Sequence, residues 1–308
     1  MIRRSGFVAI IGFPNAGKST LLNTILKQKL SIVSPRPQTT RYRIEGIYST
    51  ADTQIIFVDT PGFIVAESGL NHILQVEIED AIDKSDLILI LIEPKNIPLL
   101  DENNNVFCSF RKRINDSKKP VILALNKCDT LTQAEVETST KELMAKNISR
   151  EIVAISALNN TNIDKLIDTL GRYLPDGEFL YDPDQISIKS ERFLAQEMIR
   201  EQLFYLLKKE IPYECAVTIE KFDESDRENS DPQKRIVRIS GVIYVARESL
   251  KPIIIGKGGE MIKKIGILSR KNIEDLLGCS VFLELRVIVK KNWNKDKYFL
   301  ADLGYEKV

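Results

Sequence analysis

The sequence predicts two domains of different fold class: an α/β domain with a mostly parallel sheet over residues 1–174, and a smaller α+β domain over residues 188–291. In the first, short aliphatic strands alternate with helical segments, which is typical of a parallel sheet covered by helices on both faces. In the second, the expected order is helix, strand, strand, helix, helix, strand. Residues 175–187 contain two prolines, a glycine and several acids, so we expect a linker there, followed beyond the second domain by a tail over 292–308.

The predicted elements rest on local patterns of apolar residues. Strands of the first domain are expected at the aliphatic runs 7–11, 54–58, 86–92, 121–125 and 151–156. A helix is expected at 162–170, where apolar residues fall at i, i+3, i+4 and i+7. The second domain is predicted to contain helices at 188–209 and 260–277, and strands at 213–222, 234–246 and 280–289.

Composition excludes several classes of protein. With 308 residues, 43% hydrophobic and 28% charged, the chain has the composition of a globular protein, which excludes wholesale disorder, collagen and coiled coil. Its longest aliphatic run, LILILI at 87–92, is far shorter than the roughly 20 residues of a membrane span. The four cysteines lie far apart with no CxxC pair, so we expect reduced thiols in a cytoplasmic protein.

The net charge of +1 hides an uneven distribution. Residues 1–175 are close to neutral, residues 176–233 carry 7 basic and 15 acidic side chains, and residues 234–308 carry 16 basic and 8 acidic ones. A basic block at the end of a neutral chain favours a local surface for an anionic polymer, although ordinary solvated lysines and arginines explain the charge alone equally well.

A glycine-rich loop, GFPNAGKS, follows the first predicted strand at residues 12–19 and matches the pattern GxxxxGK[ST] without a mismatch. Such a loop lets the backbone wrap a phosphate, with several N–H groups and a helix N-terminus pointing at the anion. Lys18 is expected to reach the β- and γ-phosphates, and the Ser19 hydroxyl to hold Mg²⁺. The predicted phosphate-binding residues of this loop are Gly12, Asn15, Ala16, Gly17, Lys18, Ser19 and Thr20.

Two further segments carry groups suited to sensing a third phosphate. DTPG at 59–62 follows the strand at 54–58, so Asp59 is expected to hold Mg²⁺ through water and the Gly62 N–H to contact the γ-phosphate. PQTTR at 37–41 lies in a polar stretch before that strand, where a threonine would ligate Mg²⁺ only in the presence of the γ-phosphate. Together they predict an order–disorder switch.

The base is selected by residues at the ends of two later strands. NKCD, at Asn126, Lys127 and Asp129, follows the strand at 121–125. The Asp129 carboxylate can accept two hydrogen bonds from guanine, whereas adenine has no such pair of donors and would leave it unpaired. Ser156 and Ala157 follow the next strand, where a backbone N–H can meet guanine O6. The sequence therefore predicts GTP and GDP as ligands, with Mg²⁺.

The second domain carries the loop GKGG, at Gly256, Lys257, Gly258 and Gly259. It fits the GXXG loop with which KH domains clamp nucleic-acid backbone, and the order of elements resembles a type II KH domain. The flanking Lys263 and Lys264 belong to the basic block, so we expect these six residues to bind RNA and not DNA. The competing interpretation is an α+β dimerisation domain with a glycine-rich turn.

The set GFPNAGKS, QTTR, DTPG, NKCD and SAL resembles the translation-factor class of small GTPases. With the second domain included, residues 7 to about 291 resemble the Era-type GTPases, which join a P-loop GTPase domain to a C-terminal type II KH domain. The resemblance implies that Thr40 is the Mg²⁺ ligand of the switch and that Asn15 coordinates K⁺. Phe63 follows DTPG where signalling GTPases place a water-orienting glutamine, so the catalytic residue stays unassigned.

The resemblance also implies a function: GTP hydrolysis to GDP and phosphate, coupled to binding of small-subunit (16S) ribosomal RNA near its 3′ end and to assembly of the small ribosomal subunit. We expect a monomer, and a weak peripheral contact with the inner membrane stays open. One alternative is an RNA-binding module whose nucleotide is only structural, and another is a P-loop kinase, which NKCD and SAL disfavour. His72, the single histidine, is more simply a solvated side chain than a general base.

Overall fold

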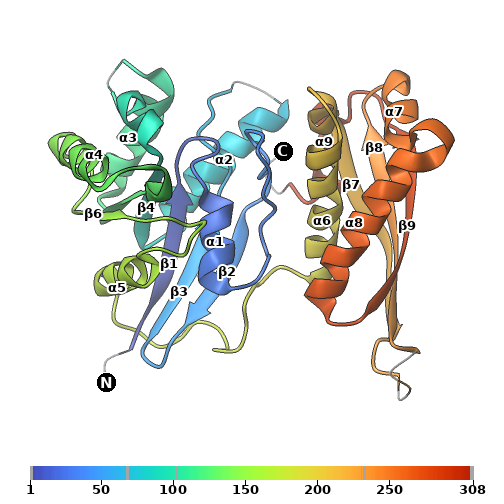
Figure 1. Ribbon diagram of the computed structural model, residues 1–308, viewed down its shortest axis with the longest axis horizontal. Helices are drawn as coiled ribbons and strands as arrows, with labels where there is room; N and C mark the ends of the chain where they lie inside the picture. The colour runs from blue at the N-terminus through green and yellow to red at the C-terminus, as the bar shows by residue number, and fades with distance from the viewer. Residues whose placement is uncertain (1–2, 67–68, 102, 230, 232–233, 306–308) are drawn as a thin grey trace. The chain divides into compact units, whose positions relative to one another are not determined.

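The computed structural model describes residues 3–66, 69–101, 103–229, 231 and 234–305, in two compact units. The first unit consists of Met1–Val33 and Thr40–Ile188, and the second of Ser34–Thr39 and Lys189–Val308. Figure 1 shows the elements of both units along the chain. Within the described residues, no helix is long and apolar enough to cross a membrane.

The first unit is built on a six-stranded sheet with helices on both faces (Figure 1). The strand order is β2 (Ile44–Ser49), β3 (Thr53–Asp59), β1 (Arg4–Ile11), β4 (Leu87–Ile92), β5 (Val121–Leu125) and β6 (Glu151–Ala154). All neighbours pair in parallel except β2 and β3, which are antiparallel. The helices are α1 (Lys18–Leu26), α2 (Gly69–Lys84), α3 (Asn105–Ser117), α4 (Gln133–Ala145) and α5 (Ile163–Tyr173). This confirms the predicted α/β class.

Five of the six strands match the aliphatic runs of the sequence. The sixth, β2, was not predicted, because IEGIYS mixes a glycine and polar residues with its isoleucines. Gly46 leaves room for the side chains of α1: a Cβ there would lie 2.4 Å from Leu26 Cδ1, so the bare backbone lets the helix pack closely on the sheet. The edge strand therefore depends on tertiary packing.

The predicted linker hydrogen-bonds to β2 and β3. The Gln54 side chain accepts from the backbone N–H groups of Leu180 (2.8 Å) and Tyr181 (3.0 Å) and donates to the Tyr181 carbonyl (2.9 Å). The Ile47 N–H donates to the Ile186 carbonyl at 2.7 Å. These bonds explain why the contacts of residues 175–188 group them with the first unit.

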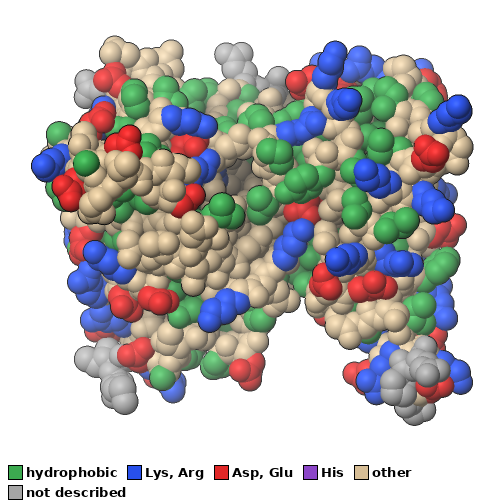
Figure 2. Space-filling model, in the orientation of Figure 1, with side chains coloured by type: hydrophobic (Ala, Val, Ile, Leu, Met, Phe, Trp, Pro, Cys, Tyr) green, Lys and Arg blue, Asp and Glu red, His purple; other side chains and the backbone are tan. Residues whose placement is uncertain are grey.

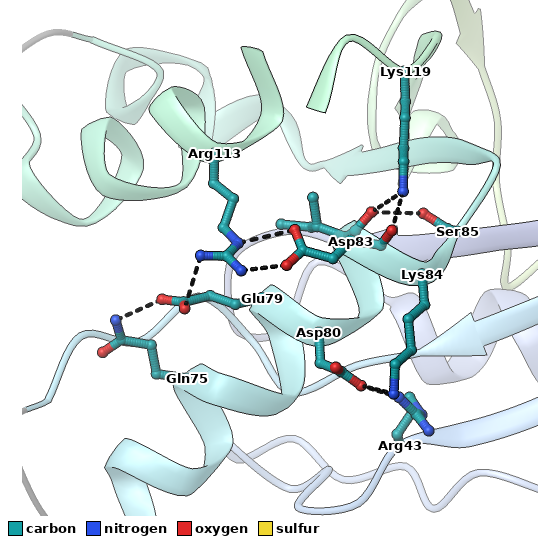
Figure 3. A network of polar contacts seen from close by, with 10 residues as sticks. Arg43, Gln75, Glu79, Asp80, Asp83, Lys84, Ser85, Arg113 and Lys119 are labelled. Atoms are coloured by element: carbon teal, nitrogen blue, oxygen red, sulfur yellow. Dashed lines mark hydrogen bonds and ion pairs between the residues drawn. The ribbon is translucent and has the colours of Figure 1, made fainter. Parts of the chain in front are cut away.

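The end of α2 is fixed to its neighbours by ion pairs, which Figure 3 shows. Asp80 accepts from Arg43 at 2.8 Å and from Lys84 at 2.9 Å. Arg113 of α3 pairs with Asp83 and lies 3.4 Å from Glu79. This network anchors the C-terminal half of α2 to Arg43 and to α3.

The second unit is an α+β domain with a three-stranded sheet, which confirms the predicted class. It contains α6 (Glu191–Leu206), β7 (Cys215–Asp226), β8 (Ile236–Val245), α7 (Lys251–Ile255), α8 (Glu260–Leu277), β9 (Ser280–Val289) and α9 (Lys297–Asp302). The sheet order is β7-β8-β9, with β7 antiparallel and β9 parallel to β8. One hydrophobic core joins α6, α8 and the sheet, with Ile199, Ile243 and Ile273 fully buried.

Residues 292–305 of the tail pack on this domain. Trp293 is fully buried and its indole N–H donates to the Glu214 carbonyl at 3.0 Å. Phe299 of α9 is buried too and meets the Tyr244 ring edge-on. Trp293 is therefore a core residue, and base stacking by this side chain is excluded in this arrangement.

Ser34–Thr39, although early in the chain, belongs to the second unit. Arg36 donates to the backbone carbonyls of Leu207 and Lys209. Arg200 of α6, itself fully buried, pairs with Glu197 and donates to the Thr39 carbonyl at 2.7 Å. A buried guanidinium needs such partners, since an unpaired charge in the interior is very costly.

Candidate nucleotide site and nucleic-acid loop

The glycine-rich loop and the start of α1 form a cradle with positive character. Gly17 lies at φ 97°, and a Cβ there would meet Asn126 Nδ2 at 2.4 Å, so no other residue fits without displacing that amide. Lys18 is buried, and its Nζ donates to the carbonyls of Gly12 and Phe13 at 3.1 Å each. Burial lowers the pKa of Lys18 to about 8, and the nearby Asp59 carboxylate opposes that shift. A bound phosphate would stabilise the charged form.

Three oxygen-bearing side chains predicted to serve Mg²⁺ come together beside this cradle. Ser19 Oγ donates to Asp59 Oδ2 at 2.7 Å and lies 2.9 Å from Thr40 Oγ1. Asp59 is fully buried, and its Oδ1 finds no hydrogen-bond partner among the described residues. Burial raises the pKa of Asp59, while Lys18 and Ser19 oppose this. Hydroxyl and carboxylate oxygens are the ligands that Mg²⁺ takes in proteins, so the set fits that ion.

The structure distinguishes the two threonines of PQTTR. Thr40 Oγ1 faces Ser19, whereas Thr39 Oγ1 bonds with Ser34 Oγ at 2.5 Å and donates to the Arg36 carbonyl at 2.9 Å. Of the two threonines, Thr40 is therefore the one beside Ser19, and its role as a Mg²⁺ ligand stays a prediction.

The residues predicted to bind guanine join two strand ends to the phosphate loop. Asn126 Nδ2 donates to the Ala16 carbonyl at 2.8 Å, and its Oδ1 accepts from the Ala157 N–H at 2.9 Å. Ser156 Oγ donates to Asp129 Oδ1 at 2.5 Å. The Asp129 side chain is exposed and free to meet a base, so the fold brings the whole predicted set together.

Lys127 lies along the phosphate loop and is held by a residue that sequence reasoning missed. Its Nζ donates to the Asn15 carbonyl at 2.8 Å and pairs with Glu93 Oε2 at 2.6 Å. Glu93 is buried, and its Oε1 accepts from Lys95 and Asn96. The available signal was its position at the carboxyl end of a strand, where parallel sheets carry their sites.

Phe63 is part of the core. Its ring stacks on Phe110 at 4.6 Å between centroids and meets Phe13 edge-on at 5.3 Å. A buried phenyl ring has no group with which to orient water. Phe63 therefore does not supply the missing catalytic group. His72 is exposed, and its Nδ1 lies 3.1 Å from the Ala66 carbonyl. Gly62 packs against Pro14: a Cβ there would lie 2.8 Å from its backbone.

The GKGG loop joins α7 to α8 in the second unit. Gly256 lies at φ 75°, and a Cβ there would be 2.7 Å from the Met261 nitrogen, so the turn needs glycine. Gly258 and Gly259 also have positive φ angles but face open space. Lys257 is exposed, as are Lys263 and Lys264 on α8, and Figure 2 shows lysines and arginines among acidic side chains on this face. The loop therefore presents open backbone beside positive charge.

Comparison with models of protein families identifies the class of protein to which each of the two units belongs. Residues 7–127 match the family model described as 50S ribosome-binding GTPase, and residues 210–294 match the KH domain model. The fold and the two sites are thus those of a P-loop GTPase domain joined to a KH domain.

Full-length relatives narrow the class to one family. The chain is 39% identical to the GTPase Era of Lactobacillus helveticus, over 99% of this chain and 97% of that one. It is 40% identical to that of Caldanaerobacter subterraneus, over 99% of both. A crystal structure of a mutated Aquifex aeolicus Era bound to GDP and aluminium fluoride aligns with a TM-score of 0.90, at 37% identity, covering 98% of this chain and 99% of that chain. A second crystal structure shows Era in complex with MgGDPNP and nucleotides 1506–1542 of 16S ribosomal RNA. It aligns with the same TM-score of 0.90, at 37% identity and with the same coverage. The chain belongs to the GTPase Era family.

Proposed function

We propose that this protein is a GTP-hydrolysing switch that binds 16S ribosomal RNA near its 3′ end through the second unit and assists assembly of the small ribosomal subunit. The observation that carries the proposal is the meeting of three side chains beside the phosphate loop: Ser19 Oγ lies 2.7 Å from Asp59 Oδ2 and 2.9 Å from Thr40 Oγ1. Mg²⁺ bound there would neutralise charge on the phosphates. The relatives' names and the RNA in one relative's complex support the substrate and the partner.

Nucleotide recognition follows from the residues of the site. The phosphate loop and Lys18 bind and orient the phosphates, and Gly62 offers its N–H to the γ-phosphate. The Asp129 carboxylate, which is oriented by Ser156, accepts hydrogen bonds from guanine. The Ala157 N–H donates to guanine O6. In this proposal catalysis depends on positioning and charge, because Phe63 replaces a water-orienting glutamine. Asn15 is proposed as the ligand of a K⁺ ion.

Coupling between nucleotide and RNA is proposed to run through Ser34–Thr39. Thr40 serves the metal site, and the preceding residue, Thr39, accepts from Arg200 of α6. When loss of the γ-phosphate frees Thr40, the contacts of its neighbour change with it. Binding of either ligand would then alter the affinity for the other by the same factor.

For the wider organisation we propose the domains 1–174 and 188–291, the linker 175–187 and the tail 292–308. A monomer in the cytoplasm is proposed, with any membrane contact peripheral. RNA binding is assigned to Gly256, Lys257, Gly258, Gly259, Lys263 and Lys264, whose loop is exposed and basic.

Crosslinking of the full-length protein to RNA in the GTP and GDP states, followed by sequencing of the attached fragments, tests the proposal. We expect fragments from the 3′ end of 16S RNA, with different yields in the two states. Equal yields would favour the alternative, an RNA-binding module with a structural nucleotide. Single-turnover hydrolysis with and without RNA separates the two, because only a productive switch hydrolyses GTP.

A further inference from the structure

The phosphate loop and the NKCD segment each contain a residue with a left-handed backbone. Asn15 lies at φ 62° and Lys127 at φ 66°. Residues other than glycine seldom adopt this conformation, and it persists only where the surrounding contacts hold it. Here a hydrogen bond runs between the two residues, from Lys127 Nζ to the Asn15 carbonyl at 2.8 Å. It ties the loop that is expected to bind phosphate to the segment that is expected to bind guanine.

Glu93 holds the amine at one end of that bond. It directly follows β4 and is 3% exposed. Its Oε2 accepts from Lys127 Nζ at 2.6 Å, and its Oε1 accepts from Lys95 Nζ at 3.0 Å and from Asn96 Nδ2 at 3.2 Å. Both carboxylate oxygens therefore have partners, as a buried charge requires, and Oε2 is the one directed at Lys127.

The position of the Lys127 amine depends on this carboxylate. A lysine side chain is long and flexible and its ammonium is strongly hydrated, so a backbone carbonyl alone holds it weakly. Glu93 adds an ionic partner, and because its carboxylate is buried, water screens the attraction less than it would at the surface. The pair with Lys95 is different, since the Lys95 side chain is 70% exposed and such surface pairs contribute little.

We propose that Glu93 is a positioning residue for nucleotide binding: it holds the Lys127 amine on the Asn15 carbonyl, so that the phosphate loop and the NKCD segment stay joined around a bound nucleotide. This inference rests on the proposed function, because it adds a residue to the same nucleotide site. None of the three residues belongs to 37–41 or 59–62, the segments expected to respond to the γ-phosphate. Glu93 is therefore expected to slow the release of GDP as well as of GTP.

The test measures release of a fluorescent GDP analogue, mant-GDP, from the full-length protein. Glu93→Gln keeps the shape but removes the charge. Release is then expected to be about fivefold faster, because a neutral amide holds an ammonium less firmly than a carboxylate does. Glu93→Asp keeps the charge but withdraws it by one methylene, so it should also speed release, and it gives a second reading if Glu93→Gln is unstable. Thermal unfolding shows which variants are folded.

A double-mutant cycle separates positioning from a general structural role. Lys127→Met removes the amine, and in that background Glu93→Gln is expected to give no further acceleration, because the carboxylate has no amine left to hold. Lys95→Gln is the matched control, since Lys95 pairs with the other oxygen of the same carboxylate. It should change the release rate by less than about twofold.

Three results would overturn the role of Glu93 while leaving the proposed function intact. They are an unmutated release rate in both Glu93 variants, the same acceleration by Glu93→Gln with and without Lys127, and an acceleration by Lys95→Gln equal to that by Glu93→Gln. Failure of the unmutated protein to bind mant-GDP would overturn the proposed function as well.

Discussion

Ser156 donates its hydroxyl to the Asp129 carboxylate across 2.5 Å, which joins the loops that follow two neighbouring strands, β5 and β6. The same two loops are joined again by the bond from the Ala157 N–H to Asn126 Oδ1. The Asp129 carboxylate is therefore oriented before any base arrives, and little reorganisation accompanies guanine binding.

Replacing Asp129 by Asn exchanges the acceptor for an amide that pairs with xanthine. We expect GTP affinity to fall by at least about a hundredfold and xanthosine-triphosphate binding to appear. The reason is that one acceptor oxygen of the carboxylate becomes an N–H₂ donor. Titration calorimetry with the two nucleotides measures both, and ATP serves as the negative control. Unchanged GTP affinity in this variant would show that Asp129 does not select the base.

If Asn15 binds K⁺, potassium should accelerate GTP hydrolysis relative to sodium at equal ionic strength. Without a glutamine or arginine to stabilise the transition state, turnover should be slow, roughly 10⁻⁴ to 10⁻² per second. Asn15→Ala should remove the difference between the salts while phosphate release in sodium stays the same. Equal rates for the unmutated protein in both salts would exclude the potassium site.

We expect Lys18 to take up a proton when the nucleotide binds. Its pKa is lowered to about 8 in the free protein, and a bound phosphate raises it again, so binding takes up a proton wherever the free lysine is partly neutral. Uptake should be roughly half a proton near pH 8 and should approach zero as the pH falls towards 7, so affinity weakens as the pH rises. Calorimetry of GDP binding in buffers of different ionisation enthalpy gives this number directly.

Gly258→Asp should weaken RNA binding, because a carboxylate would stand where the loop offers open backbone to phosphate. Gly258→Asn is the matched control: asparagine has the same shape and tolerates the positive φ of 61° equally well. Each lost phosphate contact should also reduce the slope of log affinity against log salt by roughly 0.7. GTP affinity should stay normal in both variants, and equal RNA binding by the two would exclude a phosphate contact at this loop.

Arg200→Lys tests the coupling proposed through Ser34–Thr39. Lysine keeps the charge beside Glu197 but loses the planar fork that reaches the Thr39 carbonyl as well. The factor by which GTP changes RNA affinity should fall towards one, while RNA binding without nucleotide stays within about twofold. Thermal unfolding checks that the variant is folded. The role of Arg200 would be contradicted if the variant kept the coupling factor of the unmutated protein, measured both as the effect of GTP on RNA affinity and as the effect of RNA on GTP affinity.

Much of the fold and most of the proposed nucleotide site were predictable because they depend on local sequence. LILILI and VILAL are apolar runs of strand length that are buried on both faces of the sheet, and the spacing of GFPNAGKS places Lys18 and Ser19 at the start of α1. NKCD and SAL also follow strands directly, so the parallel sheet brings Asp129 and Ser156 to the same edge.

The remaining features depend on contacts between residues far apart in the sequence. β2 is a strand because β3 pairs with it. Glu93 holds Lys127 along the phosphate loop because Lys127 also reaches the Asn15 carbonyl. Nothing in PQTTR says which threonine faces Ser19, and nothing in KLSIV says that Ser31 is buried. The amino-acid sequence alone determined the fold class, the nucleotide motifs and the KH loop. Only the tertiary structure decided which side chains share the metal site, because burial and hydrogen bonding between distant segments exist only in the folded chain.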